Sequence, residues 1–290
     1  MSTVLNELLS LLELEPVEKD IFRGQSQDLG FPALFGGQVL GQAMSAAQAT
    51  VEPGRTAHSL HAYFLEAGDA KSPVVYLVEN LRDGGTFSTR RIKAVQHGRA
   101  IFALTASFQV AEEGFEHQDE MPAVPGPEGL KSERELAEPL AERLPKKILE
   151  NFLTEMPIEM RPVVFHDPTA PTVAEPVRYV WMKANGQMPD DLRIHQYLLA
   201  YASDFNFLPT SLQPHGRSYM DPSLQVASID HAMWFHRDFR MDDWLLYVVK
   251  SANAGAGRGL VRGQFFDRQG RLVASTTQEG LIRQRKPRNG

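Results

Sequence analysis

A hydroxyl, two carboxylates and two imidazoles lie close together in residues 226–239, within otherwise apolar sequence. These polar residues are Ser228, Asp230, His231, His236 and Asp238, and three aromatic rings are interspersed among them. Such groups can position water and transfer protons. The segment is therefore a candidate lining of a catalytic or binding site. A buried strand whose His and Asp only satisfy each other is the alternative.

The run from 226 to 235 favours a strand, because it is rich in β-branched and aromatic residues and contains no Gly or Pro. Side chains alternate along a strand, which places Ser228 and Asp230 on one face and His231 on the other. Both faces would then carry polar groups among large apolar ones. We expect a strand covered on both sides, with a pocket at one end.

The composition is that of a globular protein, with 42% hydrophobic and 23% charged residues among 290. The net charge of -6 argues against a nucleic-acid partner bound through the overall field. The absence of cysteine excludes disulfides, thiolate metal sites and a cysteine nucleophile, and it fits a reducing, cytoplasmic location. No apolar run is longer than that of residues 244–249, which is far shorter than the roughly 20 residues of a membrane span. The N-terminal apolar residues lack a preceding basic region, so we expect no signal peptide.

The sequence pattern of the first part of the chain predicts an α+β unit, in which helix 35–47 is followed by a meander of strands. A second helix, rich in small residues, can be approached closely by neighbouring elements. Asp83-Gly84-Gly85 is typical of a hairpin turn. The expected helices are 3–13 and 35–47, and the expected strands are 21–25, 57–66, 74–82, 86–97 and 99–111.

The same order of elements returns after a connection. Residues 113–160 are charged and contain several prolines, with a helical stretch near 132–153, and we interpret them as a linker between units 1–112 and 161–290. The second unit predicts a helix near 190–205 and strands near 225–236, 243–253, 258–267 and 270–283. His61-Ala62-Tyr63-Phe64 also matches His231-Ala232-Met233-Trp234 at an offset of 170. These matches indicate a duplicated unit.

Four segments together resemble the acyl-CoA thioesterase II family. They are Gly36-Gly37-Gln38-Val39-Leu40-Gly41-Gln42-Ala43, residues 58–64, Ser228-Ile229-Asp230-His231-Ala232-Met233-Trp234-Phe235-His236, and residues 272–280. The resemblance covers nearly the whole chain and is weakest over 112–175. It implies a double hotdog fold, in which a long central helix is wrapped by an antiparallel sheet twice over. It also implies hydrolysis of acyl-CoA without a cofactor, and self-association into a homo-oligomer.

The resemblance implies three catalytic residues, Asp204, Ser228 and Gln278. Asp204 would accept a proton from the attacking water, while Ser228 and Gln278 hold that water. Burial of Asp204 near Tyr197 and Tyr201 predicts a raised pKa for its carboxyl.

Other functions stay open. A hotdog-fold hydratase would need a His after Asp204-Phe205-Asn206, and none follows in the required place. A protein that binds acyl-CoA as a sensor or carrier would need none of the three catalytic residues. The chain has no Gly-x-Ser-x-Gly motif of a nucleophile-elbow hydrolase. Metal binding is disfavoured, because the spacings of His231 with His236 and of His58 with His61 put each pair on opposite faces of a strand.

Several cations are candidates for binding the phosphates of coenzyme A, although solvated surface charge is the alternative. The Gly-rich segment 255–259 joins two strands and opens no helix, so we expect a hairpin there. The candidates are Arg258 and Arg262 beside this hairpin, with Arg90, Arg91 and Lys93 in the first unit.

One active site per chain is expected, in the second unit. At an offset of 170, Ser228 matches His58, and at an offset near 171 Gln278 matches Ser107. Asp204 matches a run of small residues near Ala46 without a carboxylate. His58 is therefore the one first-unit residue that could still contact substrate, and a structural role is the alternative.

Overall fold

The structure, a computed structural model, describes residues 2–30, 33–144, 149 and 153–285. The first unit contains α1 (Thr3–Leu12), β1 (Glu15–Glu18), β2 (Ile21–Gly24), α2 (Gly36–Gln48), β3 (Arg55–Phe64), β4 (Val74–Asp83), β5 (Phe87–Gln96) and β6 (Arg99–Val110). The second contains α3 (Glu133–Ala137), β7 (Ile158–Pro162), β8 (Val177–Ala184), α5 (Leu192–Ser203), α6 (Phe207–Leu212), β9 (Leu224–Ser228), β10 (Asp230–Phe235), β11 (Leu245–Gly255), β12 (Arg258–Asp267) and β13 (Leu272–Gln284).

Within the residues that the structure describes, these strands form one antiparallel sheet of 13 strands, with β3 and β10 paired at its centre. Outward from the centre, the first unit runs β3-β6-β5-β4-β2-β1 and the second runs β10-β13-β12-β11-β8-β7, while β9 pairs with β13. Each unit thus places its strands in the same order relative to the shared seam. This symmetry agrees with the duplication predicted from the sequence.

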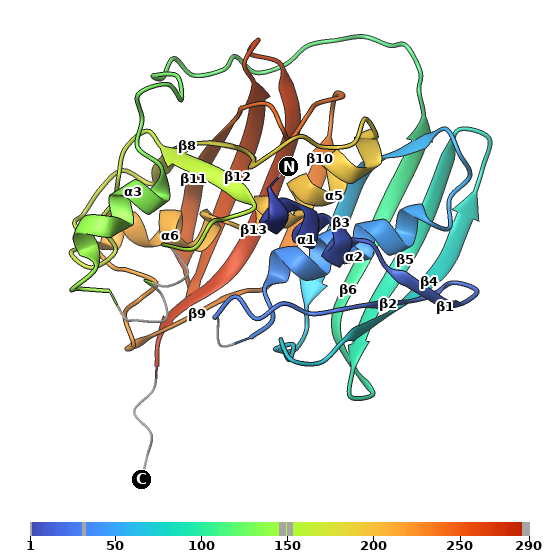
Figure 1. The fold of residues 1–290 in the computed structure, drawn as a ribbon, viewed down its shortest axis with the longest axis horizontal. Helices are drawn as coiled ribbons and strands as arrows, with labels where there is room; N and C mark the ends of the chain where they lie inside the picture. Colours follow the sequence, from blue (N-terminus) through green and yellow to red (C-terminus); the bar gives the residue numbers. More distant parts are fainter. Residues whose placement is uncertain (1, 31–32, 145–148, 150–152, 286–290) are drawn as a thin grey trace.

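Helices α2 and α5 lie side by side on one face of the sheet (Figure 1). The small residues of α2 permit this contact. A Cβ on Gly37 would collide with the backbone carbonyl of Tyr201, and one on Gly41 would lie 3.0 Å from the carbonyl of Tyr197. It is therefore mainly the backbone of α5 that lies close to these two glycines of α2. Most of α2 is buried, and α1 adds Leu5, Leu8 and Leu12 to the same core.

The register of the sheet shows that the predicted offset of 170 is wrong by one residue. Ala57 lies opposite Phe108, and Ser228 lies opposite Gly280, so Ala57 and Ser228 are equivalent at an offset of 171. His58 causes a register shift between Ala57 and Ser59, and Ile229 separates β9 from β10 at the equivalent position. An offset of 170 would put every equivalent side chain on the opposite face.

Two hairpins and most element bounds match the sequence predictions. The turn at Asp83-Gly84-Gly85 joins β4 to β5, and the Gly-rich segment closes the β11–β12 hairpin, with Ala256 and Gly257 at positive φ. The sequence analysis missed β1, β7, β8 and α6. Its single strand 225–236 is wrong, because Ile229 splits it.

The connection carries no regular element from 112 to 131, and α3 begins only at Glu133. Ser132 caps α3, since its side chain accepts a hydrogen bond from the N–H of Glu135. The later part of the expected helical stretch, at 145–148 and 150–152, lies outside the described residues. Within the described part of the chain, no helix has the length and apolar character that a membrane crossing requires.

Candidate active site

The structure brings Asp204, Ser228 and Gln278 together. Gln278, in the middle of β13, donates from Nε2 to Ser228 Oγ over 2.7 Å. Ser228, the last residue of β9, lies with Oγ 3.4 Å from Asp204 Oδ1, and the Gln278 amide lies near enough to the Asp204 carboxyl to lower its pKa. These three side chains, contributed by a helix end and two strands, converge on one point.

Asp204 sits where the helix ends. The side chain of Asp191 caps the N-terminus of α5 by accepting from the N–H of Arg193, and Asp204 is the C-terminal cap. Asn206 follows in the left-handed region, with φ 68°, and turns the chain into α6. Asn tolerates that conformation better than most residues. The apolar face of α5 and this turn together fix the carboxyl against the strands.

The environment of Asp204 favours its neutral form. Burial raises the pKa of this carboxyl to about 7, against smaller opposite effects of hydrogen bonds from Gln278, Ser228 and the Gly37 N–H. The residue as a whole is nevertheless only half-buried. A carboxylate with a pKa near neutrality is well matched to accept a proton from water at physiological pH.

The N-terminus of α2 forms the opposite wall of the site. A Cβ on Gly36 would lie 2.7 Å from Asp204 Oδ2 and 2.8 Å from the Phe64 ring, so only glycine fits. The Gly37 N–H lies near enough to the carboxyl to lower its pKa slightly. The site is therefore shared by both units. Sequence reasoning missed this contribution, although the Gly-Gly pair at the start of the helix was a visible signal.

His231 is a further residue of the site, beyond the three that the family resemblance implied. Its ring lies with Nδ1 2.7 Å from Gln278 Oε1 and Nε2 3.0 Å from Ser203 Oγ. Burial lowers the pKa of the imidazole to about 4, so it is neutral at physiological pH. The predicted alternation placed His231 and Ser228 on opposite faces. The interruption at Ile229 reverses that phase, and both side chains reach Gln278.

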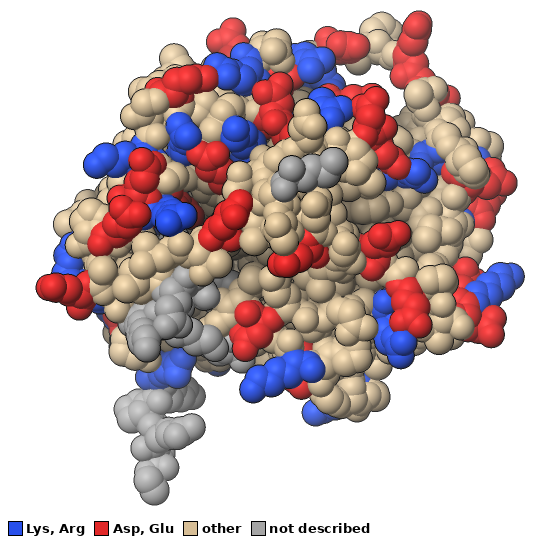
Figure 2. Space-filling model, in the orientation of Figure 1, with Lys and Arg blue, Asp and Glu red and all other residues tan. Residues whose placement is uncertain are grey.

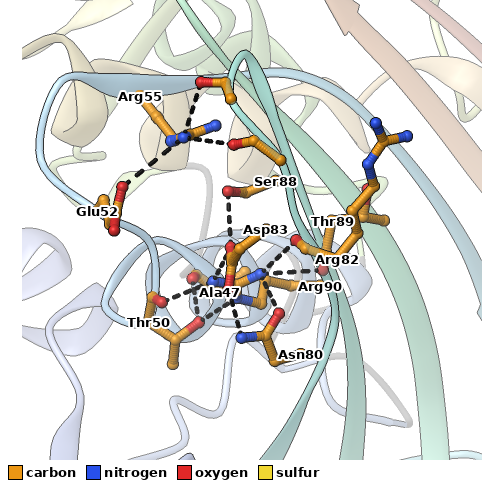
Figure 3. A network of polar contacts seen from close by, with 12 residues as sticks. Ala47, Thr50, Glu52, Arg55, Asn80, Arg82, Asp83, Ser88, Thr89 and Arg90 are labelled. Carbon is orange, nitrogen blue, oxygen red and sulfur yellow. Dashed lines mark hydrogen bonds and ion pairs between the residues drawn. The ribbon is translucent and has the colours of Figure 1, made fainter.

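Arg90 is the clearest correction to the predicted phosphate-binding cations. Its side chain is 1% exposed, and Figure 3 shows it enclosed by the end of α2 and the β4–β5 hairpin. The guanidinium donates to Thr50, Asn80 and Asp83 and to the backbone carbonyls of Arg82 and Thr89. Every N–H of Arg90 is used in this network. No donor remains for a phosphate.

The other candidate cations are exposed but lie away from the three catalytic candidates. Burial alternates along β5 and β12 so that Arg91, Lys93, Arg258 and Arg262 face outward, whereas Gln278 faces the helices. Arg91 pairs with Glu79 at 3.2 Å and Arg258 with Glu279 at 2.9 Å. The face drawn in Figure 2 shows basic and acidic side chains interspersed, with no large patch of one sign.

His58 lies at the equivalent end of the first unit. It lines a surface cavity of about 250 Å³ together with Gln196, Phe235, His236 and Asp238. Its Nε2 is 2.7 Å from Ser107 Oγ, and burial lowers the pKa of its ring. None of the three catalytic candidates lines this cavity. The structure thus separates His58 from them.

Comparison with known proteins gives one consistent result. Residues 148–281 match the family described as acyl-CoA thioesterase, and residues 24–109 match the acyl-CoA thioesterase N-terminal domain. Acyl-CoA thioesterase 2 of Haemophilus influenzae is 47% identical over 98% of this chain and 99% of its own length. Human acyl-coenzyme A thioesterase 8 is 42% identical over 94% of this chain and 88% of its own.

Solved structures agree with the sequence relatives. An acyl-CoA thioesterase II, TesB2, from Mycobacterium marinum has a TM-score of 0.78 at 41% identity, covering 96% of this chain and 99% of that one. A protein with a hot dog fold from Alicyclobacillus acidocaldarius has a TM-score of 0.77 at 19% identity over 97% of this chain and 99% of its own, which shows the fold alone. The chain therefore belongs to the acyl-CoA thioesterase family.

Proposed function

We propose that the protein hydrolyses acyl-CoA to a free fatty acid and coenzyme A, using a water molecule held by Asp204, Ser228 and Gln278. The convergence of these three side chains around a carboxyl whose pKa is raised to about 7 is the observation that carries the proposal. Binding of an acyl chain alone would need neither a tuned base nor the two polar groups beside it.

The chemistry follows from the groups present. Asp204 accepts a proton from water while the water oxygen bonds to the thioester carbonyl carbon, giving a tetrahedral intermediate. That intermediate collapses by breaking the C–S bond. The proton held by Asp204 passes to the departing sulfur, so carboxylic acid and thiol are formed and the carboxylate is regenerated. A thioester is a good electrophile, and a positioned water suffices without a covalent nucleophile.

The fold supports the same proposal. Each unit has a helix packed against its part of the antiparallel sheet, and the two units repeat the same strand order. We propose that each unit is one hotdog domain and that the chain is a double hotdog. We also propose that the protein acts in the cytoplasm and as a homo-oligomer.

A release assay for the free thiol, run on acyl-CoAs from short to long chain, tests the activity. Asp204→Asn should lower kcat about 10²- to 10⁴-fold, because the amide is similar in shape but cannot accept the proton. Asp238→Asn makes the same chemical change at an exposed residue and should keep wild-type turnover. Full activity of folded Asp204→Asn would overturn the assignment of the base.

A non-catalytic acyl-CoA binder and a hydratase are the competing functions. A binder would show no thiol release at any chain length while still retaining acyl-CoA. A hydratase would add water to an enoyl-CoA and leave the thioester intact, which absorbance of the conjugated double bond would reveal. Asp204-Phe205-Asn206 leads here into α6 and no His follows within that helix.

The coenzyme phosphates would be met by the exposed cations that remain, Arg91, Lys93, Arg258 and Arg262. Their attraction to the phosphates is screened by salt, so the KM for acyl-CoA should rise with ionic strength. Arg262→Ala should reduce that rise. A KM independent of salt would remove these residues from the binding site.

A further inference from the structure

His231 occupies a buried position that the hydrolytic scheme does not use. Its side chain is 1% exposed and lies between Ser203 and Gln278, with both ring nitrogens in hydrogen bonds. The edge of the ring also packs against Phe207, with the centroids 5.5 Å apart and the planes at 89°. The imidazole is thus held in one orientation, in contact with Gln278.

The Gln278 amide can present a donor to the Asp204 carboxylate in only one of its two orientations. An ionised carboxylate accepts hydrogen bonds and cannot donate them, so the amide must turn its NH₂ toward Asp204. Nε2 does so, and it also donates to Ser228 Oγ. After a half turn of the amide, Oε1 would face the carboxylate instead. Two oxygen acceptors would then repel each other, and the donor that holds the base would be lost.

The contact with His231 distinguishes the two orientations. Oε1 of Gln278 needs a donor, and the Nδ1–H of a neutral imidazole supplies one at 2.7 Å. Because burial keeps the ring neutral, Nε2 then carries no proton and accepts from the hydroxyl of Ser203. That hydroxyl also lies within 2.9 Å of the carbonyl of Ala200, a second acceptor that competes with Nε2 for its single proton.

The first unit lacks the three catalytic candidates, and it shows which side chains pack at the position equivalent to His231 and Gln278. His231 lies one step beyond the Ala232–Thr277 pair and so faces Gln278. The equivalent pair in the first unit is Leu60 and Ala106, both buried. An apolar pair therefore satisfies packing at this position of the sheet. The His and the Gln occur together in the unit that carries the carboxylate.

We propose that His231 is a positioning residue, whose Nδ1–H fixes the Gln278 amide with its NH₂ toward the Asp204 carboxylate. This inference rests on the proposed function, because His231 would affect hydrolysis only through the role proposed for Gln278. Ser203 acts one step further out by selecting the tautomer of His231.

The first test compares kcat and KM in a double-mutant cycle. His231→Leu copies the first unit and should lower kcat about 10- to 100-fold with little change in KM, since the substrate is not contacted. His231→Asn restores an N–H donor near the position of Nδ1 and should recover most of that loss. Gln278→Ala should be impaired by itself, and adding His231→Leu to it should cost nothing more.

The outcomes separate the two proposals. If Gln278→Ala turns over like wild type, the assignment of Gln278 to the site fails and the positioning role of His231 falls with it, while acyl-CoA hydrolysis itself stands. If no protein, wild type included, releases thiol, the proposed function fails. If Gln278→Ala is impaired but His231→Leu is not, or if His231→Leu costs the same factor with and without Gln278, only the positioning role is overturned.

A second measurement serves if His231→Leu does not fold. ¹⁵N NMR of the His231 ring, assigned by its absence in His231→Asn, reports which nitrogen carries the proton. We expect Nδ1–H in the wild type and a mixture of tautomers in Ser203→Ala, which also loses kcat about 3- to 10-fold. An Nε2–H tautomer in the wild-type protein would overturn the proposal.

Discussion

The carboxylate of Asp204, at the end of α5, lies against Gly36, in the first turn of α2, where a Cβ would come within 2.7 Å of Oδ2. The two residues belong to different units of the chain. The proposed base is therefore held by groups from both units, and its position depends on how closely α2 and α5 approach each other.

Gly36→Ala should impair catalysis more than folding. The new Cβ would lie 2.7 Å from Asp204 Oδ2 and 2.8 Å from Phe64, so the carboxylate must shift. A displacement of about 1 Å in a catalytic group can cost about 10²-fold in rate. Gly85→Ala is the matched control, because nothing lies within 4 Å of its Cβ, and it should keep wild-type kcat. Equal kcat values for the two variants would contradict the prediction.

The pH dependence of kcat should report the ionisation of Asp204. Its carboxyl, whose pKa is raised to about 7 by burial, must be ionised to accept a proton. Turnover at saturating acyl-CoA should rise with pH up to about 7, fall about tenfold for each unit well below that value, and level off above it. A profile that stays flat from pH 5 to pH 8 would show that another group is the base.

Asp204→Asn should stabilise the fold at high pH. The folded pKa of about 7 lies above the usual value near 3.8, so the unfolded chain releases this proton first. The stabilisation of the folded state by the neutral carboxyl is complete below about pH 4 and is lost as pH rises toward 7. Above pH 7 the buried charge costs on the order of 4 kcal/mol, which the amide avoids.

Urea unfolding of the two proteins at pH 8 and at pH 4.5 measures this difference. Asp204→Asn should be the more stable protein at pH 8, and the gap should shrink at pH 4.5. A gap that does not change with pH would mean that the carboxyl is not neutral in the folded state.

Each chain should bind one substrate productively. Where the second unit has Ser228, His231 and Gln278, the first has Ala57, Leu60 and Ala106. Titration with a non-hydrolysable acyl-CoA analogue should saturate at one equivalent per chain. His58→Ala should keep kcat within about threefold, because His58 contacts none of the catalytic candidates. Two equivalents, or an inactive but folded His58→Ala, would place chemistry in the first unit.

The sequence predicted the order of elements well because apolar periodicity and turn residues are local signals. The strands of both meanders and the helices α1, α2 and α5 lie within a few residues of their expected positions. β8 was missed although Val177–Ala184 is rich in β-branched and aromatic residues, since it stands next to a Pro-rich connection. Its place in the sheet depends on pairing with β11, a contact between residues distant in the chain.

The candidate site was predicted in part. Asp204, Ser228 and Gln278 came from family resemblance, and their convergence is a tertiary fact that spacing does not contain. The inward direction of His231 depends on the interruption at Ile229, and one inserted residue reverses the face of all that follow. From the sequence, Arg90 was predicted to be an exposed cation. Only the packing of Thr50 and Asp83 around it shows that it is structural.

Because both units contribute to the site, the connection between them is a place where the chain can be cut into two complementary fragments. Residues 111–120 are exposed and form no regular structure, and the segment passes outside the sheet (Figure 1). A chain cut there would yield one fragment with the carboxylate and another with the glycines that surround it. Neither fragment would hold all of the proposed catalytic residues and their surroundings, and turnover should return only when β3 and β10 pair again. The protein is thus a natural starting point for a split reporter, in which thiol release records the meeting of two fused partners.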